Sequence, residues 1–330
     1  MKKILLSILL TSSFVANAQF WTEKATGFAT PGRSLYSISI VDASVVWALA
    51  CDSTVDPVDV TIKEFTRSND SGLTWIPGTI DLGANTSGFG TSSITAVSST
   101  IAWVSVYGDS SNPGGIWKTI DGGLTWNKQT TASFTIDSYV NFVHFWDASN
   151  GIAHGDPESG EFEIYTTTDG GTNWGRVPAA NIPDPNMDIN GEYGYENFYS
   201  VSGNTIWFGT DRGRIFKSVD KGLNWTAHLS PSANFELDKF SFSNTNKGLL
   251  TIYDTPILLY NTTDGGENWN LVTTTTPVFN TAISYIPGTS KVIATDWKNP
   301  LGSSYSINDG VTWMNIDGVP HGISVFLNDS

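Results

Sequence analysis

Short runs of β-branched and aromatic residues recur along the chain and are bounded by Gly, Asn, Asp and Ser, a pattern typical of β-strands. First strands of a repeated unit are expected at Leu35–Ile40, Ser93–Val97, Val140–Trp146, Phe198–Val201, Leu237–Phe242 and Thr281–Ile286. Second strands are expected at Val45–Ala50, Ile101–Tyr107, Gly151–His154, Thr205–Gly209, Gly248–Tyr253 and Lys291–Thr295. The pattern predicts no helix after the N-terminal segment. It therefore indicates an all-β fold.

One short segment occurs six times without gaps, with the consensus (S/T)-x-D-x-G-x-(T/N)-W. The copies are Ser68–Trp75, Thr119–Trp126, Thr167–Trp174, Ser218–Trp225, Thr262–Trp269 and Ser306–Trp313. Their anchor positions are Asp70, Asp121, Asp169, Asp220 and Asp264, with Asn308 in the last copy. Successive anchors are 51, 48, 51, 44 and 44 residues apart. This spacing matches four-stranded blades of a β-propeller.

Each position of the repeat suits the turn of a β-hairpin. The Asp side chain can accept hydrogen bonds from backbone amides that follow it, and the Gly supplies a positive φ. The Trp then begins the returning strand and covers a neighbouring blade.

The repeat resembles the Asp-box, or bacterial neuraminidase (BNR), repeat of the sialidase and sortilin-like propeller superfamily. Xyloglucanases and photosystem II assembly factors share it. In size the chain is most similar to assembly factor-type propellers and to exported repeat proteins of Bacteroidota-like bacteria. The resemblance implies that the box joins the third and fourth strands, on the face opposite the one that carries activity. It therefore assigns the six anchor residues a structural role.

The two ends of the sequence favour a seventh blade. Gly322–Phe326 resembles a first strand, and Phe20-Trp21 resembles a fourth strand that no box precedes. Propellers commonly close by completing one blade with strands from both termini. The middle two strands of this blade would be missing, which predicts a chain truncated at its C-terminus. Six complete blades are the alternative.

Residues 1–18 have the three parts of a secretory signal peptide. Lys2 and Lys3 precede an apolar run from Ile4 to Val15, and Ala16-Asn17-Ala18 forms the cleavage site. We expect residues 19–330 to form one propeller, monomeric and without a membrane span, that is secreted, periplasmic or at the surface of a Gram-negative bacterium. The single cysteine, Cys51, excludes an intramolecular disulfide.

The charge balance excludes some partners. The chain has 17 Lys and Arg against 32 Asp and Glu, a net charge of −15, and no basic stripe. Nucleic acid and anionic membranes are therefore not expected as ligands.

A second periodicity places one Asp after each second strand: Asp52, Asp109, Asp156, Asp211, Asp254 and Asp296. If the blades form as predicted, these carboxylates lie at one mouth of the channel. They could attract calcium or a cationic partner. Alternatively, each Asp begins a turn by accepting hydrogen bonds from its own backbone. The stretch His154–Glu158 is interpreted as a turn and not as a metal site.

The longest loop between blades, Gly175–Glu196, carries Tyr193 and Tyr195 and is a candidate ligand contact. The sialidase resemblance would further imply an arginine clamp, a Tyr–Glu nucleophile pair and an Asp acid. Arg33, Arg212 and Arg214 could lie on one face, but the arginine motif expected before the first box is absent.

The sequence contains no cofactor fingerprint and no Ser-His-Asp pattern. The resemblance to xyloglucanases would imply a cleft between two propellers, whereas this chain is expected to form one. The sequence therefore favours a non-enzymatic module that binds protein or glycan on the face away from the boxes. A sialidase-like or other glycoside hydrolase is the alternative.

Overall fold

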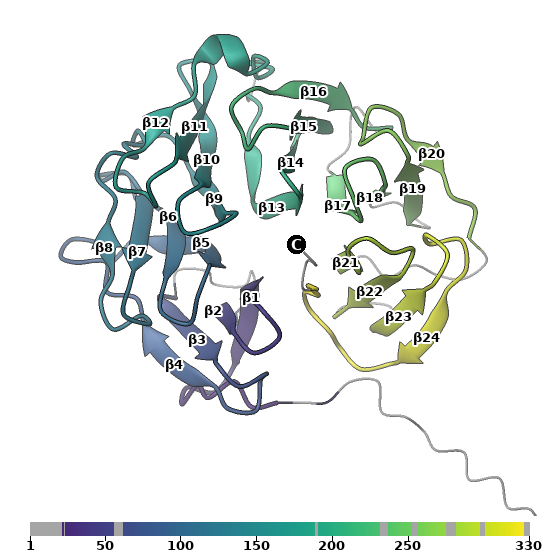
Figure 1. The fold of residues 1–330 in the computed structure, drawn as a ribbon, viewed down its shortest axis with the longest axis horizontal. Helices are drawn as coiled ribbons and strands as arrows, with labels where there is room; N and C mark the ends of the chain where they lie inside the picture. The colour runs from purple at the N-terminus through teal and green to yellow at the C-terminus, as the bar shows by residue number, and fades with distance from the viewer. Residues whose placement is uncertain are drawn as a thin grey trace, which may run out of the picture.

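The computed structural model describes residues 22, 24–55, 62–188, 191–231, 237–252, 257–274, 282–297 and 301–326. The predicted signal peptide and Phe20-Trp21 lie outside these residues. In the described part of the chain, 24 strands form six four-stranded antiparallel sheets, arranged as blades around a central axis (Figure 1). The only helical element there is one 3-10 turn, η1 (Ala179–Asn181). The predicted all-β propeller is confirmed, with the six blades of the alternative.

The blades follow one another along the chain. Blade 1 consists of β1 (Arg33–Ile40), β2 (Val46–Asp52), β3 (Glu64–Ser68) and β4 (Ile76–Thr79). Blade 2 consists of β5 (Gly90–Ala96), β6 (Ala102–Tyr107), β7 (Gly115–Thr119) and β8 (Asn127–Lys128). Blade 3 consists of β9 (Val140–Phe145), β10 (Gly151–Glu158), β11 (Glu161–Thr167) and β12 (Gly175–Arg176).

The second half of the chain repeats this arrangement. Blade 4 consists of β13 (Gly194–Ser202), β14 (Thr205–Thr210), β15 (Arg214–Ser218) and β16 (Thr226–Leu229). Blade 5 consists of β17 (Leu237–Phe242), β18 (Gly248–Ile252), β19 (Leu258–Thr262) and β20 (Asn270–Leu271). Blade 6 consists of β21 (Ala282–Tyr285), β22 (Val292–Asp296), β23 (Gly302–Ser306) and β24 (Met314–Asp317). In each blade the first strand lies nearest the axis (Figure 1).

The interpretation of His154–Glu158 as a turn is wrong, because β10 continues through Glu158. The register against β11 shifts between Gly155 and Pro157. A proline lacks the N–H for a regular ladder and is accommodated at such an irregularity. The strand therefore carries Asp156 further along the blade than the sequence pattern suggests.

Each repeated segment forms the predicted hairpin turn between third and fourth strands. In blade 2, the Thr119 hydroxyl donates to Asp121 (2.8 Å) and accepts from the Gly123 N–H (2.9 Å). The Asp121 carboxylate also accepts from the N–H (3.0 Å) and hydroxyl (2.6 Å) of Thr125. Gly123 has φ 87°, and the residue before it, Gly122, has φ 77°. Asn308 accepts the equivalent backbone bond from Thr312 at 3.0 Å, so an amide oxygen serves in the last copy.

Hydrophobic clusters join successive blades, and most of the repeated tryptophans belong to them. Between blades 1 and 2, Trp126 packs edge-on against Trp47 and Phe65 at centroid distances of 6.5 and 5.7 Å. Serine hydroxyls also accept hydrogen bonds from the backbone of the neighbouring first strand. For example, the Ser93 hydroxyl accepts from the Val143 N–H at 2.9 Å. The Trp residues of the last five boxes therefore cover inter-blade cores, as expected, whereas Trp75 of the first box is half-buried and belongs to none of these clusters.

The predicted first strand at Gly322–Phe326 is not part of a sheet, although this segment contacts blade 6. The Thr295 hydroxyl donates to the Gly322 carbonyl, and the Ser284 hydroxyl donates to the Ser324 carbonyl. The segment thus lies along β21 and β22 without forming a ladder. The six four-stranded sheets account for the described strands.

Candidate functional site

The repeated turns lie on the same face of the propeller as the turns between first and second strands. In each blade, a backbone N–H of the repeated turn donates to a carbonyl of the other turn, for example Ser71 to Ser44 (3.0 Å) and Gly265 to Asn246 (2.7 Å). Since neighbouring strands are antiparallel, the second strands end on the opposite face. We call this opposite face, with the ends of the second strands and the loops between blades, the loop face.

Strand β13 departs from regular pairing on the loop face. Gly194 pairs with Thr210, and the next pair is Tyr199 with Phe208, so β13 contains extra residues between these positions. Asn197, inside this bulge, has φ 51°, which Asn tolerates better than most residues. Bulges of this kind redirect side chains near functional sites.

The bulge brings Glu196 into contact with two other blades. One carboxylate oxygen accepts a hydrogen bond from the hydroxyl of Tyr139, which precedes β9, and the other accepts from Tyr36 of β1. The Ser37 hydroxyl donates to Asn197 at 3.3 Å. The bonds from Tyr36 and Ser37 join β1 to β13 across the channel, around which these strands lie in Figure 1, whereas the bond from Tyr139 joins the neighbouring blades 3 and 4. We call Tyr36, Tyr139 and Glu196, with Tyr107 and Asp156, the channel cluster.

The other members of the channel cluster adjoin this group. The ring of Tyr107 stacks on that of Tyr139, with centroids 4.4 Å apart and an interplanar angle of 20°. The Asp156 carboxylate accepts hydrogen bonds from the Asn141 amide (2.7 Å) and the Gly194 N–H (2.9 Å). Asp156 thereby ties β10 to the first residue of the bulged strand.

Burial determines the protonation of this cluster. Burial raises the pKa of Asp156 to about 6, and the negative charges of Asp211 and Glu196 raise it further. The hydrogen bonds from Asn141 and Gly194 act in the opposite direction and lower this pKa. Burial also raises the pKa of Glu196, although both phenol hydrogen bonds oppose the shift. The pKa of Tyr36 and that of Tyr139 are raised by burial and by the nearby Glu196 charge. Both phenols therefore remain hydrogen-bond donors at neutral pH.

The three candidate arginines do not form a common clamp. Arg33 in blade 1 contacts Asp52 (2.9 Å) and makes two hydrogen bonds to Glu64 (3.1 and 3.2 Å). Arg212 and Arg214 lie in blade 4, separated from blade 1 by two intervening blades along the chain. Each guanidinium is therefore neutralised within its own region of the fold.

The two arginines of blade 4 anchor the long loop Gly175–Glu196. Arg212 contacts Asp188 (2.7 Å) and Asp211 (3.1 Å), and Arg214 contacts the buried Glu192 (2.7 Å). Tyr193, at the end of this loop, is 40% exposed. Its ring lies 5.7 Å from that of Tyr195, which is half-buried. Both candidate tyrosines therefore lie in the segment of the chain that leads into Glu196.

The ring of Asp residues has mixed roles. Asp52 accepts from the N–H of Thr54 (2.9 Å) and Asp109 from that of Ser111 (2.8 Å), which are local turn contacts. Asp211 accepts from the N–H of Tyr193 (2.9 Å). Asp296 is buried at the end of β22, and Asp254 lies outside the described residues. Of the five that the structure describes, Asp156 is the one that belongs to the channel cluster.

No group of three or more His, Cys, Asp or Glu residues within the described ranges is arranged to hold a metal ion. The donor set nearest to one, Asp156 with Glu196, includes phenols and an amide that donate hydrogen bonds to the carboxylates. These donors occupy the oxygen positions that calcium would need. The described residues therefore contain no preassembled calcium site, and calcium binding stays a prediction from the sequence.

Sequence reasoning missed Glu196 and its two tyrosines. Tyr36 lies within a predicted first strand, where an aromatic residue looks like core, and Tyr139 comes just before another. The sequence carries no periodic signal for them, because the extra residues that place Glu196 belong to the irregularity of one strand, β13.

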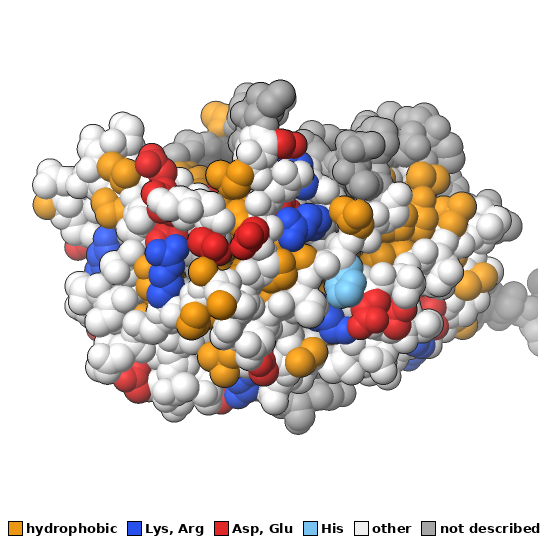
Figure 2. Space-filling view, turned by 90° about the horizontal axis from the view of Figure 1, so that it is seen from above, with side chains coloured by type: hydrophobic (Ala, Val, Ile, Leu, Met, Phe, Trp, Pro, Cys, Tyr) orange, Lys and Arg blue, Asp and Glu red, His pale blue; other side chains and the backbone are white. Residues whose placement is uncertain are grey.

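The surface shows no concentration of basic residues on the side drawn in Figure 2. Lysine and arginine side chains there are scattered among acidic and uncharged ones. No helix in the described ranges has the length and apolarity needed to cross a membrane.

No protein-family model matches the chain, and no curated protein matches it. Several solved structures are similar to the chain in fold. One is YCF48 bound to D1 peptide, with a TM-score of 0.58 and 16% identity over 86% of this chain and 82% of that one. Another is the GH74 xyloglucanase from Xanthomonas campestris, with a TM-score of 0.53 and 16% identity over 86% of this chain. The match covers 47% of that enzyme.

A third similar structure is a catalytically inactive variant of virginiamycin B lyase from Staphylococcus aureus with quinupristin. It has a TM-score of 0.50 and 13% identity over 87% of this chain and 85% of that one. Identities this low support a shared fold only. The chain is therefore a β-propeller protein, similar in fold to both peptide-binding and polysaccharide-cleaving propellers.

Proposed function

We propose that the protein is a secreted, monomeric, non-enzymatic propeller that binds a cationic segment of a partner protein at the channel cluster. The observation that carries this proposal is Glu196, a half-buried carboxylate held between Tyr36 and Tyr139 at the centre of the loop face. Its position where three blades meet gives a partner one central anchor point.

Charge supports a cationic ligand. Among the described residues, neither Glu196 nor Asp156 has a Lys or Arg within ion-pair distance, whereas Arg33, Arg212 and Arg214 are already paired. Carboxylates crowded without a counter-ion have raised pKa values, and an incoming cation would stabilise their ionised forms. The net charge of −15 would also speed the approach of a cationic partner.

The neighbouring rings support an ammonium or guanidinium group in preference to calcium. The stacked Tyr107 and Tyr139 offer π-faces beside the carboxylate. A Lys or Arg side chain can contact an aromatic face and a carboxylate together. The peptide bound by the YCF48 structure is a precedent for a peptide ligand on a propeller of this fold.

The proposal is tested with an array of short peptides that differ in Lys and Arg content, probed with the protein lacking residues 1–18. Cationic peptides should bind, and binding should weaken as salt is raised. A glycan array run in parallel tests whether saccharides are the better ligands. Absence of binding to every cationic peptide would contradict the proposal.

Glycoside hydrolysis is a second candidate function, favoured by one observation. Asp156 has a pKa of about 6 and lies near Glu196, which contacts a tyrosine, so the cluster contains an acid and a Tyr–Glu pair. Two observations favour binding instead: both Glu196 oxygens accept phenol hydrogen bonds, and no arginine clamp is assembled. Turnover of a fluorogenic sialoside or neutral glycoside, abolished by Asp156→Asn, would establish the hydrolase.

A further inference from the structure

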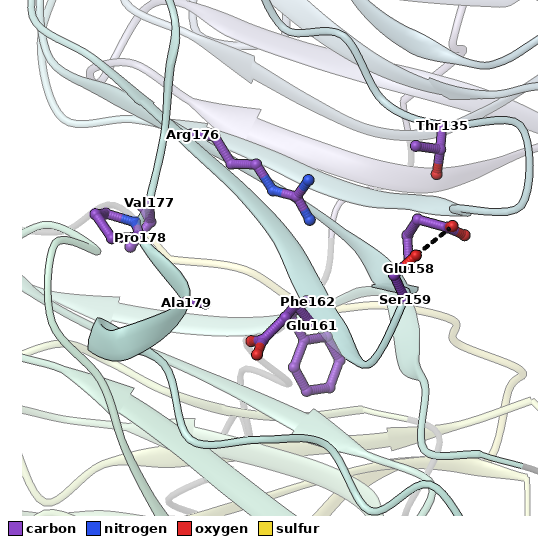
Figure 3. A pocket seen from close by; sticks show the side chains of 9 residues that line it. All are labelled: Thr135, Glu158, Ser159, Glu161, Phe162, Arg176, Val177, Pro178 and Ala179. Atoms are coloured by element: carbon purple, nitrogen blue, oxygen red, sulfur yellow. Dashed lines mark hydrogen bonds between the residues drawn. The ribbon is translucent and has the colours of Figure 1, made fainter.

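A pocket of about 510 Å³ lies on blade 3, and none of the residues that line it belongs to the channel cluster. It is bounded by the turn between β10 and β11, the segment that follows β12, and Thr135. Figure 3 shows Arg176 and Glu161 on opposite sides of this space, with Glu158 and Ser159 on one flank and Pro178 and Ala179 on the other. Its volume is in the range of about 300–1,000 Å³ typical of small-molecule sites. We call it the blade 3 pocket.

The blade 3 pocket contains a guanidinium with free hydrogen-bonding capacity. Arg176 is partly exposed, and its only ion-pair partner among the described residues is Glu163, at 3.5 Å. It makes no hydrogen bond with the rest of the described structure, although a guanidinium has five N–H donors. A ligand with adjacent acceptor atoms could therefore bind it in a bidentate manner.

Two nearby carboxylates have oxygens without a hydrogen-bond donor among the described residues: Glu161, which lines the pocket, and Glu163, which does not line it but faces Arg176 and Thr135. Glu163 is fully buried, and its Oε2 accepts from the N–H (2.7 Å) and hydroxyl (3.0 Å) of Thr135. Its Oε1, which faces Arg176, accepts no hydrogen bond within the described residues. Glu161 Oε2 is likewise buried there without a hydrogen-bond donor. Buried polar atoms are normally satisfied, so the Glu161 carboxylate, which lines the pocket, is the one that calls for a donor group on a ligand.

These requirements select a neutral, hydroxyl-rich ligand. Glu158 and Glu161 against Arg176 leave the pocket lining with net negative charge, which disfavours anions. A simple cation would be repelled by Arg176 and would leave its N–H groups without acceptors. A hydroxyl both donates and accepts, so neighbouring hydroxyls on a sugar ring can serve the guanidinium and a carboxylate together.

We propose that the blade 3 pocket binds a neutral saccharide. Phe162 and Val177 provide buried apolar surface at its base, and Pro178 and Ala179 provide exposed apolar surface at its edge. The apolar face of a sugar ring packs against such surface while its hydroxyls contact Arg176 and Glu161. This site is separate from the channel cluster and does not depend on the function proposed there.

The test is isothermal titration of the protein with maltotriose, cellotriose, xylotriose and mannotriose, with 3′-sialyllactose and spermidine as charged comparators. At least one neutral trisaccharide should bind, and the comparators should not. Ala179→Trp fills the pocket without changing its charge and should weaken binding at least tenfold. The matched control is Ala180→Trp, an exposed neighbour that does not line the pocket, and it should keep the affinity within about twofold.

Further variants separate the polar contacts from folding. Arg176→Ala and Glu161→Gln should each weaken binding at least tenfold while thermal unfolding stays cooperative. Glu196→Gln should leave saccharide binding unchanged, which separates this site from the channel cluster. The proposal is overturned if no neutral trisaccharide binds the folded protein, if Ala179→Trp binds as tightly as Ala180→Trp, or if a charged comparator binds in preference.

Discussion

Tyr36 of the first blade donates a hydrogen bond to Glu196 of the fourth blade across the channel. Two intervening blades separate β1 from β13 along the ring, so this bond joins parts of the fold that no sheet connects. It depends on the bulge in β13, which extends the strand between Gly194 and Tyr199. The bond therefore links the stability of the ring to the geometry of the candidate site.

Tyr36→Phe should lower the free energy of unfolding by about 1.5–3 kcal/mol, the usual contribution of a hydrogen bond to a charged group. The change removes one donor to Glu196 and keeps the ring that packs against blade 2. Urea unfolding measures the effect. Tyr260→Phe is the control, because the Tyr260 hydroxyl makes no hydrogen bond with other described residues. Equal effects of the two variants would show that the cross-channel bond contributes nothing.

Asp156→Asn should change how stability depends on pH. The pKa of Asp156 is about 6 in the folded protein, against a usual pKa of 3.8. Protonated Asp156 therefore stabilises the folded state, and this stabilisation is complete below about pH 4. That contribution is lost as the pH rises through 6. Asn keeps an oxygen to accept from Asn141 and Gly194 and cannot ionise.

The unfolding free energy of Asp156→Asn relative to the unmodified protein should therefore rise by about 1–3 kcal/mol between pH 4 and pH 7. Chemical denaturation at both pH values measures it. Asp137→Asn, at an exposed position before β9, is the control and should show no such rise. Parallel pH profiles for Asp156→Asn and the unmodified protein would refute the assignment.

The repeated turns should tolerate Asn better than Ala at the anchor position. The hydroxyl and N–H of Thr125 lower the pKa of Asp121 to about 2, so its stabilising effect is present above about pH 4 and lost as the pH falls through 2. Asn308 already serves one turn with an amide oxygen. At neutral pH, Asp121→Ala should lower the Tm by about 2–4 °C and Asp121→Asn by less. Calorimetry that ranks the two variants in the opposite order would contradict this account of the turn.

The contact between blade 6 and residues 321–326 should stabilise the ring. Thr295 is buried and donates to the Gly322 carbonyl, so Thr295→Val should cost about 1 kcal/mol by removing one hydrogen bond at nearly constant volume. Ser304 is equally buried, but its hydroxyl has no hydrogen-bond partner within the described ranges. Ser304→Ala should therefore be neutral or stabilising. A larger loss of stability in Ser304→Ala than in Thr295→Val would contradict this interpretation.

Much of the fold could be predicted from the sequence, because one turn recurs with fixed chemistry. The anchor Asp, the Gly with positive φ and the Trp each have local requirements, and together they fix the position of every hairpin. The strands between them then follow from the hydrophobic pattern. The predicted strand at Leu237–Phe242, for example, has the bounds of β17.

The candidate site was harder to predict from the sequence, because it depends on departures from the repeat. Glu196 reaches Tyr36 only because β13 contains extra residues, and a single insertion has no periodic signal. Asp52 and Asp109 share their sequence positions with Asp156 but accept hydrogen bonds from local turns. Burial distinguishes Asp156 from them, and burial depends on contacts with Asn141 and Gly194 that only the folded chain provides.

The central claim, that the channel cluster binds a cationic protein segment, is tested most directly by two variants with the same change in charge. Glu196→Gln removes a carboxylate from the loop face, and Glu267→Gln removes an exposed one from a repeated turn on the opposite face. Affinity for the best cationic peptide from the array is measured by fluorescence anisotropy at two salt concentrations. We predict at least a tenfold loss of affinity for Glu196→Gln and less than a twofold change for Glu267→Gln. Equal losses for the two variants, or no loss for Glu196→Gln, would contradict the claim.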